Sequence, residues 1–269
     1  MAINGILGFL GFGNMGHAIA DGLLDASRMS PDHIIVFDVD NTRTDAARAR
    51  GMTIAKSPDD MARQCDYILL AVKPQSLEEA LNQMLPGFNP RTLLISIAAG
   101  ISTTWIRQRL GDAARIARVM PNTPAMVRAG AAVVAYSDNV QQDDAVVAKT
   151  IFDAVGICEE APEEALDVVT ALSGSGPAYF FYVVECLARA AAQLGLPEDM
   201  AVRLDSQTCL GAGRLLAESG EPPHVLRARV TSKGGTTQAA LEQMQNDGLE
   251  SLLFSAVKAA AERSHQLGR

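Results

Sequence analysis

A glycine-rich segment close to the start of the chain constrains its fold more than any other feature. The segment fits the GxGxxG pattern and consists of Gly11, Phe12, Gly13, Asn14, Met15 and Gly16. It directly follows the apolar run Ile6 to Leu10, and a helical pattern begins within it. Such glycines between a strand and a helix allow a tight turn, an approach of the backbone to a pyrophosphate, and close helix–strand contact. The context favours a dinucleotide-binding turn over a merely structural one.

The first half of the chain alternates short apolar runs with amphipathic segments, which is typical of βαβ units and a mostly parallel sheet. Strands are predicted at Ile6–Leu10, Ile34–Asp38, Met52–Ala55, Tyr67–Val72, Leu93–Ile97, Ile116–Val119 and Ala131–Tyr136. Helices are predicted between them at Asn14–Ala26, Thr42–Arg50, Pro58–Arg63, Gln75–Met84 and Thr103–Leu110. The apolar strands indicate burial on both faces. We therefore expect an α/β fold with a doubly wound sheet over residues 1–160.

Strand-like runs stop after about residue 160, and helical patterns take over at Pro177–Leu194, Pro197–Ser219, Pro222–Arg229, Thr236–Asn246 and Leu249–Leu267. The first of these has only three strongly polar side chains, so most of its surface needs burial. A domain of about 100 helical residues can hardly supply that cover alone. We expect residues 161–269 to form an all-α dimerisation domain covered by a second subunit; burial within one chain is the alternative.

Composition narrows the classes of partner and compartment. The net charge is −8, from 31 acidic and 23 basic residues, without a run of Lys or Arg that would attract nucleic acid. The longest apolar runs fall far short of the ~20 residues that a membrane span requires. Four cysteines lie far apart without a CxxC pair, and neither metal-ligand nor serine-hydrolase motifs occur. We expect a cytoplasmic protein that binds neither nucleic acid, membrane nor metal.

Asp38 is the candidate for contact with the adenosine ribose of a dinucleotide. It ends the second predicted strand, 38 − 16 = 22 residues beyond Gly16, close to the spacing of about 20 expected for such a carboxylate. That position favours NADH. Asn41 and Arg43 follow, however, and such side chains can line a pocket for a 2′-phosphate. Asp38 or Asp40 as a helix cap is a further alternative, so the residues leave NADPH or NADH open.

Polar or small residues follow several strands at their carboxyl ends, where open α/β sheets bind ligands. Val72, Lys73 and Pro74 close one strand, and Ala98 and Ala99 close the next. A loop stiffened by two prolines, residues 120–124, places Asn122 after a third strand. The Lys73 side chain could donate a hydrogen bond to a ribose hydroxyl, and it is equally typical of a solvated lysine at the end of a strand.

Two polar stretches interrupt the helical half, at residues 173–177 and 231–237. Each precedes a helix and offers backbone N–H groups and hydroxyls, which suit a small anion such as a carboxylate. Helix capping alone is the alternative, but it leaves two glycines followed by two threonines unexplained. The four histidines lie singly and are typical of surface positions rather than catalytic bases.

Six motifs in this order make the chain resemble the pyrroline-5-carboxylate reductase family over essentially all 269 residues: GFGNMG (11–16), AVKP (71–74), SIAAG (96–100), MPNTP (120–124), LSGSGPAY (172–179) and TSKGGTT (231–237). The resemblance implies an N-terminal Rossmann-like domain and a helical domain that interlocks in a homodimer, with dimers building larger rings such as a decamer. It also implies reduction of 1-pyrroline-5-carboxylate to L-proline, the last step of proline biosynthesis, with NADPH or NADH.

The resemblance also implies site residues. Besides the glycine segment, the cofactor contacts would be Asp38, Val39, Asn41, Arg43, Val72, Lys73, Pro74, Ala98, Ala99 and Asn122. The substrate carboxylate would be held by Ser232, Gly235, Thr236 and Thr237, with Glu163 nearby and with Ser232 and Thr237 in the catalytic role of orienting the ring nitrogen or relaying a proton. Lys233 and Thr236 depart from a common family form of that loop without removing a needed hydroxyl or glycine.

Two alternatives come from other classes. A β-hydroxyacid dehydrogenase also pairs such a glycine loop with a helical domain, but it needs a helix-borne lysine, and Pro177–Leu194 contains none. A nucleotide sensor would bind the cofactor without turnover.

Asp38 is a more serious departure from the family pattern than Lys233 or Thr236, because several relatives place Ser or Thr near this position.

Overall fold

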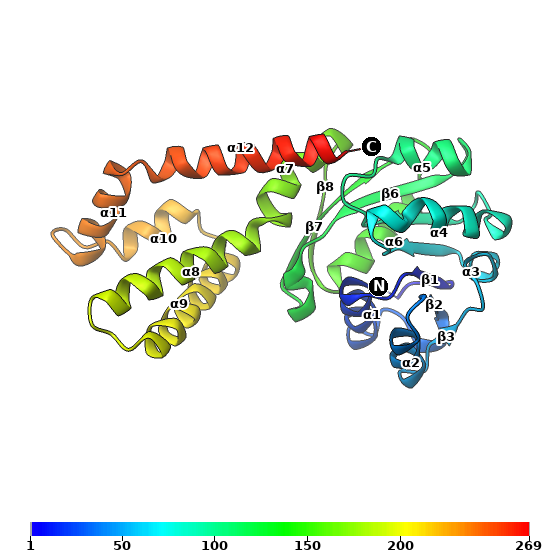
Figure 1. Cartoon of the computed structure of the whole chain (residues 1–269), viewed down its shortest axis with the longest axis horizontal. Helices are drawn as coiled ribbons and strands as arrows, with labels where there is room; N and C mark the ends of the chain where they lie inside the picture. The colour runs from blue at the N-terminus through cyan, green and yellow to red at the C-terminus, as the bar shows by residue number, and fades with distance from the viewer. Residues whose placement is uncertain (1, 269) are drawn as a thin grey trace. The chain divides into compact units, whose positions relative to one another are not determined.

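The computed structural model describes residues 2–268 and divides them into two compact units. The first unit comprises the chain up to Gly174 together with the segment from Ala260 onward, and the second comprises Ser175–Ala259. Figure 1 shows the order of the elements along the chain. The functional boundary expected at residue 160 stays a prediction, because compactness groups residues 161–174 and the chain's last turns with the sheet.

An eight-stranded sheet forms the centre of the first unit, in the order β3-β2-β1-β4-β5-β6-β7-β8. The strands are β1 (Leu7–Leu10), β2 (Ile34–Phe37), β3 (Thr53–Ile54), β4 (Tyr67–Leu70), β5 (Leu93–Ser96), β6 (Arg115–Met120), β7 (Gly130–Tyr136) and β8 (Gly156–Glu160). All neighbours pair in parallel except β6 and β7, which are antiparallel. The predicted doubly wound, mostly parallel sheet is confirmed.

Helices cover both faces of this sheet. They are α1 (Asn14–Asp25), α2 (Asn41–Ala49), α3 (Pro58–Gln64), α4 (Leu77–Met84), α5 (Thr103–Leu110), α6 (Gln142–Asp153) and the short α7 (Leu166–Val169). One core cluster joins Phe9 to Ile19 of α1 and Ile151 of α6, and the other joins Leu10 to Leu81 of α4. Phe9 and Leu10 enter opposite clusters because successive strand residues face opposite sides.

The sequence patterns did not predict α6 or β8. Strand β8 lies at the edge of the sheet, and among its residues only Cys158 is buried. Ile157 is 60% exposed and two glutamates end the strand. An edge strand that buries one side chain has no apolar run for a sequence pattern to detect.

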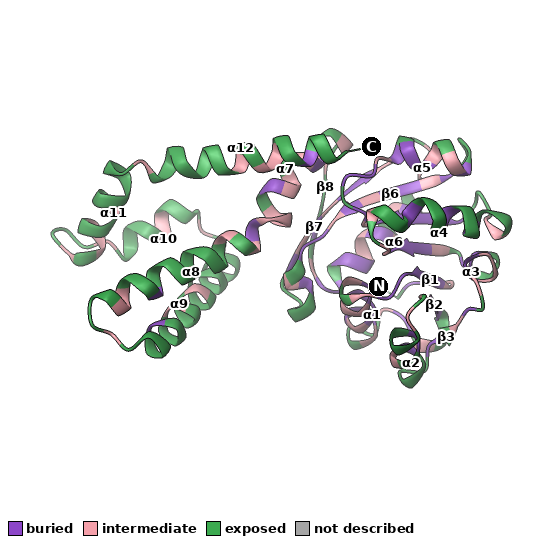
Figure 2. Cartoon of the chain, in the orientation of Figure 1, coloured by how far each residue is buried: buried purple, intermediate pink, exposed green. Residues whose placement is uncertain are grey.

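The second unit consists of helices alone. They are α8 (Gly176–Gln193), α9 (Glu198–Ser219), α10 (Pro223–Arg229), α11 (Thr236–Asn246) and most of α12 (Leu249–Leu267). Within residues 175–259 only Gly176, Ala188 and Ala201 are buried, and Figure 2 shows these helices as largely exposed. Large apolar side chains such as Phe181 and Phe254 are 69% and 70% exposed. The all-α prediction is confirmed, and the unit does not bury its own apolar surface.

Across residues 2–268, no helix combines the length and the apolar character that crossing a bilayer would require.

Candidate active site

A cleft opens in the first unit at the carboxyl end of β1, where the order of the strands in the sheet reverses. Strand β1 pairs with β2 on one side and with β4 on the other, which makes this the switch point at which open α/β sheets bind ligands. The cleft holds ≈ 570 Å³. Nine residues predicted to contact a cofactor line it: Gly11, Gly13, Asn14, Met15, Asp38, Val39, Arg43, Val72 and Lys73.

The glycine loop has the shape that a pyrophosphate requires. Gly11 has a φ of +93°, and a Cβ there would lie 2.9 Å from the carbonyl carbon of Ala71. A Cβ on Gly16 would lie 3.1 Å from the carbonyl oxygen of Gly11. Gly13 is the N-cap of α1 and supplies no side chain to the first turn, so the N–H groups there suit an anion. These residues fit a dinucleotide.

Asp38 is held by the protein around it. Its Oδ2 accepts a hydrogen bond from the backbone N–H of Phe12 at 2.6 Å, and its Oδ1 accepts one from the N–H of Asp40 at 2.9 Å. The Arg43 Nη1 lies 3.3 Å from the same Oδ2. The side chain is 4% exposed, yet it borders the cleft.

The capping alternative applies to Asp40 rather than Asp38. The Asp40 carboxylate accepts a hydrogen bond from the Thr42 backbone N–H at 2.9 Å and from the Thr42 hydroxyl at 2.6 Å. These two bonds hold the pKa of Asp40 below its ordinary value. Asp40 is therefore the N-cap of α2, and Asp38 remains beside the cleft.

Other predicted contacts lie outside the cleft lining. The Phe12 side chain is fully buried against Phe9, with ring centroids 5.6 Å apart, so a contact there would involve its backbone. Asn122 is 8% exposed; it donates to the Ser173 carbonyl and accepts from the Ala131 N–H. The rest are Gly16, Asn41, Pro74, Ala98 and Ala99, and their predicted role stays untested.

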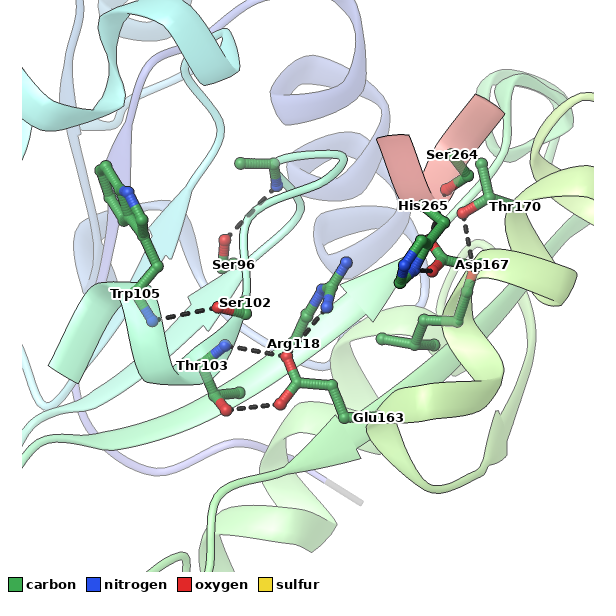
Figure 3. Close-up of polar contacts among 12 residues, drawn as sticks. Ser96, Ser102, Thr103, Trp105, Arg118, Glu163, Asp167, Thr170, Ser264 and His265 are labelled. Atoms are coloured by element: carbon green, nitrogen blue, oxygen red, sulfur yellow. Dashed lines mark hydrogen bonds and ion pairs between the residues drawn. The ribbon is translucent and has the colours of Figure 1, made fainter. Parts of the chain in front are cut away.

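Glu163 lies in a polar cluster at the carboxyl-end side of β5 and β6 (Figure 3). Its Oε1 accepts hydrogen bonds from the Thr103 N–H at 2.8 Å and from Arg118 at 2.9 Å, and its Oε2 accepts one from the Thr103 hydroxyl at 2.5 Å. Burial alone would raise the pKa of Glu163, but the bonds from Thr103 and Arg118 outweigh it and lower that pKa. The carboxylate thus fixes the start of α5 to β6.

The sequence patterns missed Thr103 and Arg118 as members of this cluster. A signal existed for one of them, because Arg118 is a cation between the buried Ala117 and Val119 of β6, and a cation that is largely buried needs a partner. Asp167, drawn in the same close-up, accepts one hydrogen bond from the Ser264 hydroxyl at 2.6 Å, and its Oδ2 lies 3.2 Å from the Nδ1 of His265. These contacts attach the end of α12 to α7 within the first unit.

The predicted substrate loop lies in the second unit, directly before α11. Gly234 has a φ of +72°, and its N–H donates to the Gln238 side chain at 2.7 Å. Gly235 is the N-cap of α11 without a capping side chain, and the Ser232 hydroxyl oxygen lies close against it, 2.4 Å from where a Cβ would stand. Thr236 and Thr237 form the first turn. The loop therefore combines N–H groups at a helix start with the hydroxyls of Ser232, Thr236 and Thr237.

Comparison with known proteins gives consistent results. Residues 163–267 match the family described as pyrroline-5-carboxylate reductase dimerisation, and residues 6–100 match NADP oxidoreductase, coenzyme F420-dependent. A pyrroline-5-carboxylate reductase of Synechocystis sp. is 41% identical over 265 residues, which cover 98% of each chain.

Two solved structures agree with the whole chain. A pyrroline-5-carboxylate reductase from Coxiella burnetii has a TM-score of 0.94 at 35% identity, covering 99% of this chain and 100% of that one. A pyrroline carboxylate reductase from Plasmodium falciparum with NADP bound has a TM-score of 0.86 at 31% identity, covering 100% of both chains.

Proposed function

The chain belongs to the pyrroline-5-carboxylate reductase family, and on that premise we propose that it reduces the cyclic imine of 1-pyrroline-5-carboxylate to L-proline with NADPH or NADH. It is thus an oxidoreductase that acts on a carbon–nitrogen double bond in proline biosynthesis. The observation that carries this proposal is the cleft at the switch point between β1 and β4, because nine of the predicted cofactor residues line it. The similarity to known reductases extends over nearly the whole chain.

The glycine loop binds the dinucleotide. The N–H groups at the start of α1 hold the pyrophosphate, and Val72 and Lys73, which follow β4, line the cleft beside the glycine loop. The backbone around Phe12 and Gly16, together with Val39, Asn41, Pro74, Ala98, Ala99 and Asn122, completes the proposed cofactor contacts. Bound there, the reduced nicotinamide supplies a hydride.

The loop at residues 231–237 binds the substrate carboxylate. The Ser232 and Thr237 hydroxyls and the backbone N–H of Thr236 donate to it. Gly235, whose own N–H donates to the Ser232 carbonyl at 3.0 Å, contributes by keeping the backbone of the loop open to the carboxylate. An uncapped helix start favours a negative charge, which supports this assignment. Ser232 or Thr237 also orients the ring nitrogen for its proton.

The chemistry places few demands on acid–base side chains. The imine carbon receives a hydride and the nitrogen receives a proton, so the C=N double bond becomes a single bond. An imine protonated from solvent is already electrophilic, and positioning then supplies much of the rate enhancement. The chain meets this demand with hydroxyls and backbone N–H groups.

Glu163 acts as a positioning residue in this proposal. Its carboxylate makes hydrogen bonds to Thr103 and Arg118, which hold the start of α5 against β6. These hydrogen bonds thereby keep residues 97–102, the segment that follows β5, in place at the carboxyl ends of the strands. A role of Glu163 near the substrate would be exerted through these two neighbours.

The assembly is a homo-oligomer, which the dimerisation family and the exposed helices support. We also propose that dimers build a larger ring such as a decamer, and that the protein is cytoplasmic. Four cysteines without a disulfide support a reducing compartment. Analytical ultracentrifugation and cell fractionation test these two points.

A turnover assay tests the proposed function. With 1-pyrroline-5-carboxylate, the absorbance of reduced nicotinamide should fall while proline accumulates in equal amount. Thr237→Ala should raise the KM for the imine about tenfold or more with unchanged dinucleotide affinity. Thr208→Ala removes an exposed helical hydroxyl that bonds only its own helix, and it serves as the control. Dinucleotide binding without proline formation would instead indicate a sensor.

A further inference from the structure

The side chains at the end of β2 form a small charged group beside the cofactor cleft. It consists of Asp38, Asp40 and Arg43, and Asp38 and Arg43 line the cleft. The Arg43 Nη1 lies 3.3 Å from Asp38, and its Nε lies 3.5 Å from Asp40. One guanidinium is thus shared between two carboxylates, and the group carries a net charge of −1.

We propose that this group makes the chain select NADH over NADPH, with Asp38 as the specificity-determining residue. The inference rests on the proposed function and deepens it. The two cofactors differ only at the adenosine ribose, where NADH has a 2′-hydroxyl and NADPH has a 2′-phosphate.

Asp38 matches the hydroxyl in hydrogen-bonding terms. An ionised carboxylate offers about four acceptor positions and no donor. The Phe12 N–H, the Asp40 N–H and Arg43 occupy three of them, which leaves room for one further donor. A ribose hydroxyl can donate there, whereas a phosphate brings only acceptors at neutral pH and would face another acceptor.

Arg43 does not relieve this conflict. A guanidinium that binds a 2′-phosphate turns its N–H groups toward it, and here the Nη1 and Nε groups of Arg43 face Asp38 and Asp40, so its positive charge is already shared with two carboxylates. The neighbouring arginines are also engaged, since Arg48 pairs with Asp45 and Arg50 pairs with Asp21. A 2′-phosphate would have to draw Arg43 away from two carboxylates and then lie beside them.

Asp38 also supports the loop that holds the pyrophosphate. Its bond to the Phe12 N–H lies within the GxGxxG turn, so the carboxylate fixes the loop and reads the ribose at once. Asparagine keeps an oxygen that accepts from the Phe12 N–H, but it removes the negative charge and, with Oδ1, the acceptor of the Asp40 N–H. Asp38→Asn therefore separates the effect of charge from that of loop support.

Calorimetric titration with NAD⁺ and NADP⁺ tests the inference without turnover. The native chain should bind NAD⁺ about tenfold or more tightly than NADP⁺, and Asp38→Asn should reduce that ratio about tenfold, mainly through tighter NADP⁺ binding. Asp45→Asn removes the same charge on α2 outside the cleft lining and should leave the ratio within about twofold.

A second measurement uses the native chain alone. AMP should bind more tightly than adenosine 2′,5′-bisphosphate, which adds only the 2′-phosphate. NADP⁺ binding as tight as NAD⁺ binding, or an unchanged ratio in a folded Asp38→Asn chain, would overturn the inference and leave the reductase function standing. Failure of both dinucleotides to bind would overturn the proposed function and the inference together.

Discussion

On β1 of the first unit, Leu7, Phe9 and Leu10 are at most 1% exposed, whereas on α8 of the second unit Phe180, Phe181 and Tyr182 are 64–69% exposed. Both regions are rich in apolar residues, so the difference lies in where the cover comes from. A doubly wound sheet places helices on both of its faces within one chain. The helices of residues 175–259 lack that cover, and a second chain has to provide it.

The comparison explains how the site residues are divided. The cofactor cleft is built from loops at the carboxyl ends of the strands, in a sheet that is covered by helices of the same chain. Its shape is therefore set within one chain. The proposed substrate loop belongs to the unit whose apolar surface needs a partner. Assembly should therefore affect the substrate loop more than the cofactor cleft.

The largest expected effect is on assembly. Phe181→Glu places a charge on the exposed apolar face of α8, and a twofold interface meets each substitution twice. Because burial of one phenylalanine contributes about 1.5–3 kcal/mol, the dimer dissociation constant should rise about 10³-fold or more. Analytical ultracentrifugation measures the shift.

The control for assembly is Val146→Glu on α6, an apolar residue of the first unit that is 41% exposed. It should leave the oligomer intact. If both variants assembled as the native chain does, the exposed face of α8 would not be an interface, and the contrast between the two units would fail.

The second expected effect concerns two glycines with similar positive φ angles. Gly11 and Gly195 have φ of +93° and +102°, but a Cβ would meet the Ala71 backbone at 2.9 Å only at Gly11. Gly195 has nothing within 4 Å. Gly11→Ala should lower the free energy of unfolding by about 3 kcal/mol or more, against about 1 kcal/mol for Gly195→Ala. Urea unfolding compares the two, and equal losses would contradict close contact in the first unit.

A third effect depends on pH. The pKa of Glu163 is lowered, so its ionised form favours the folded chain, and this contribution is present above the ordinary glutamate pKa and lost as the pH falls through the lowered one. Glu163→Gln should cost about 1–2 kcal/mol of unfolding free energy at neutral pH, and the difference from the native chain should shrink in acid.

Glu164 provides the comparison for that experiment, because it is adjacent in sequence and exposed. Glu164→Gln should change the unfolding free energy by less than about 0.5 kcal/mol at any of these pH values. A Glu163→Gln loss that stayed constant with pH would show that its carboxylate charge contributes nothing.

The smallest expected effect is on thiol reactivity. Burial raises the pKa of Cys65 to about 12, while Cys186 on α8 is exposed within the chain. If a partner covers α8, alkylation of Cys186 should be about tenfold slower in the native oligomer than in Phe181→Glu. Cys65 should stay slow in both, and peptide mass spectrometry reads each site. Equal Cys186 rates would place the interface elsewhere.

The spacing of apolar residues predicted most of the helices and strands, because each of them is specified by residues close together in the chain. The bounds of α11 and α12 match the predicted helices, and seven of the strands were found. It failed at α6 and β8, where the edge strand buries a single side chain. For the candidate site, the glycine motif, the position of Asp38 and the family resemblance predicted residues of the cleft lining. They did not predict that Phe12 buries its ring or that Glu163 bonds Thr103 and Arg118.

The glycine loop, the alternation of strands and helices, and the change to helices alone were all evident in the amino-acid sequence, because they follow from local geometry and from the spacing of apolar residues. The distant contacts of Asp38 and Glu163 depend on the tertiary structure. Besides the nearby Asp40 and Arg43, the partners of these carboxylates lie 26 residues away at Phe12, 60 at Thr103 and 45 at Arg118. Contacts over such separations depend on the register of the sheet and on the paths of its connections, which local patterns do not specify.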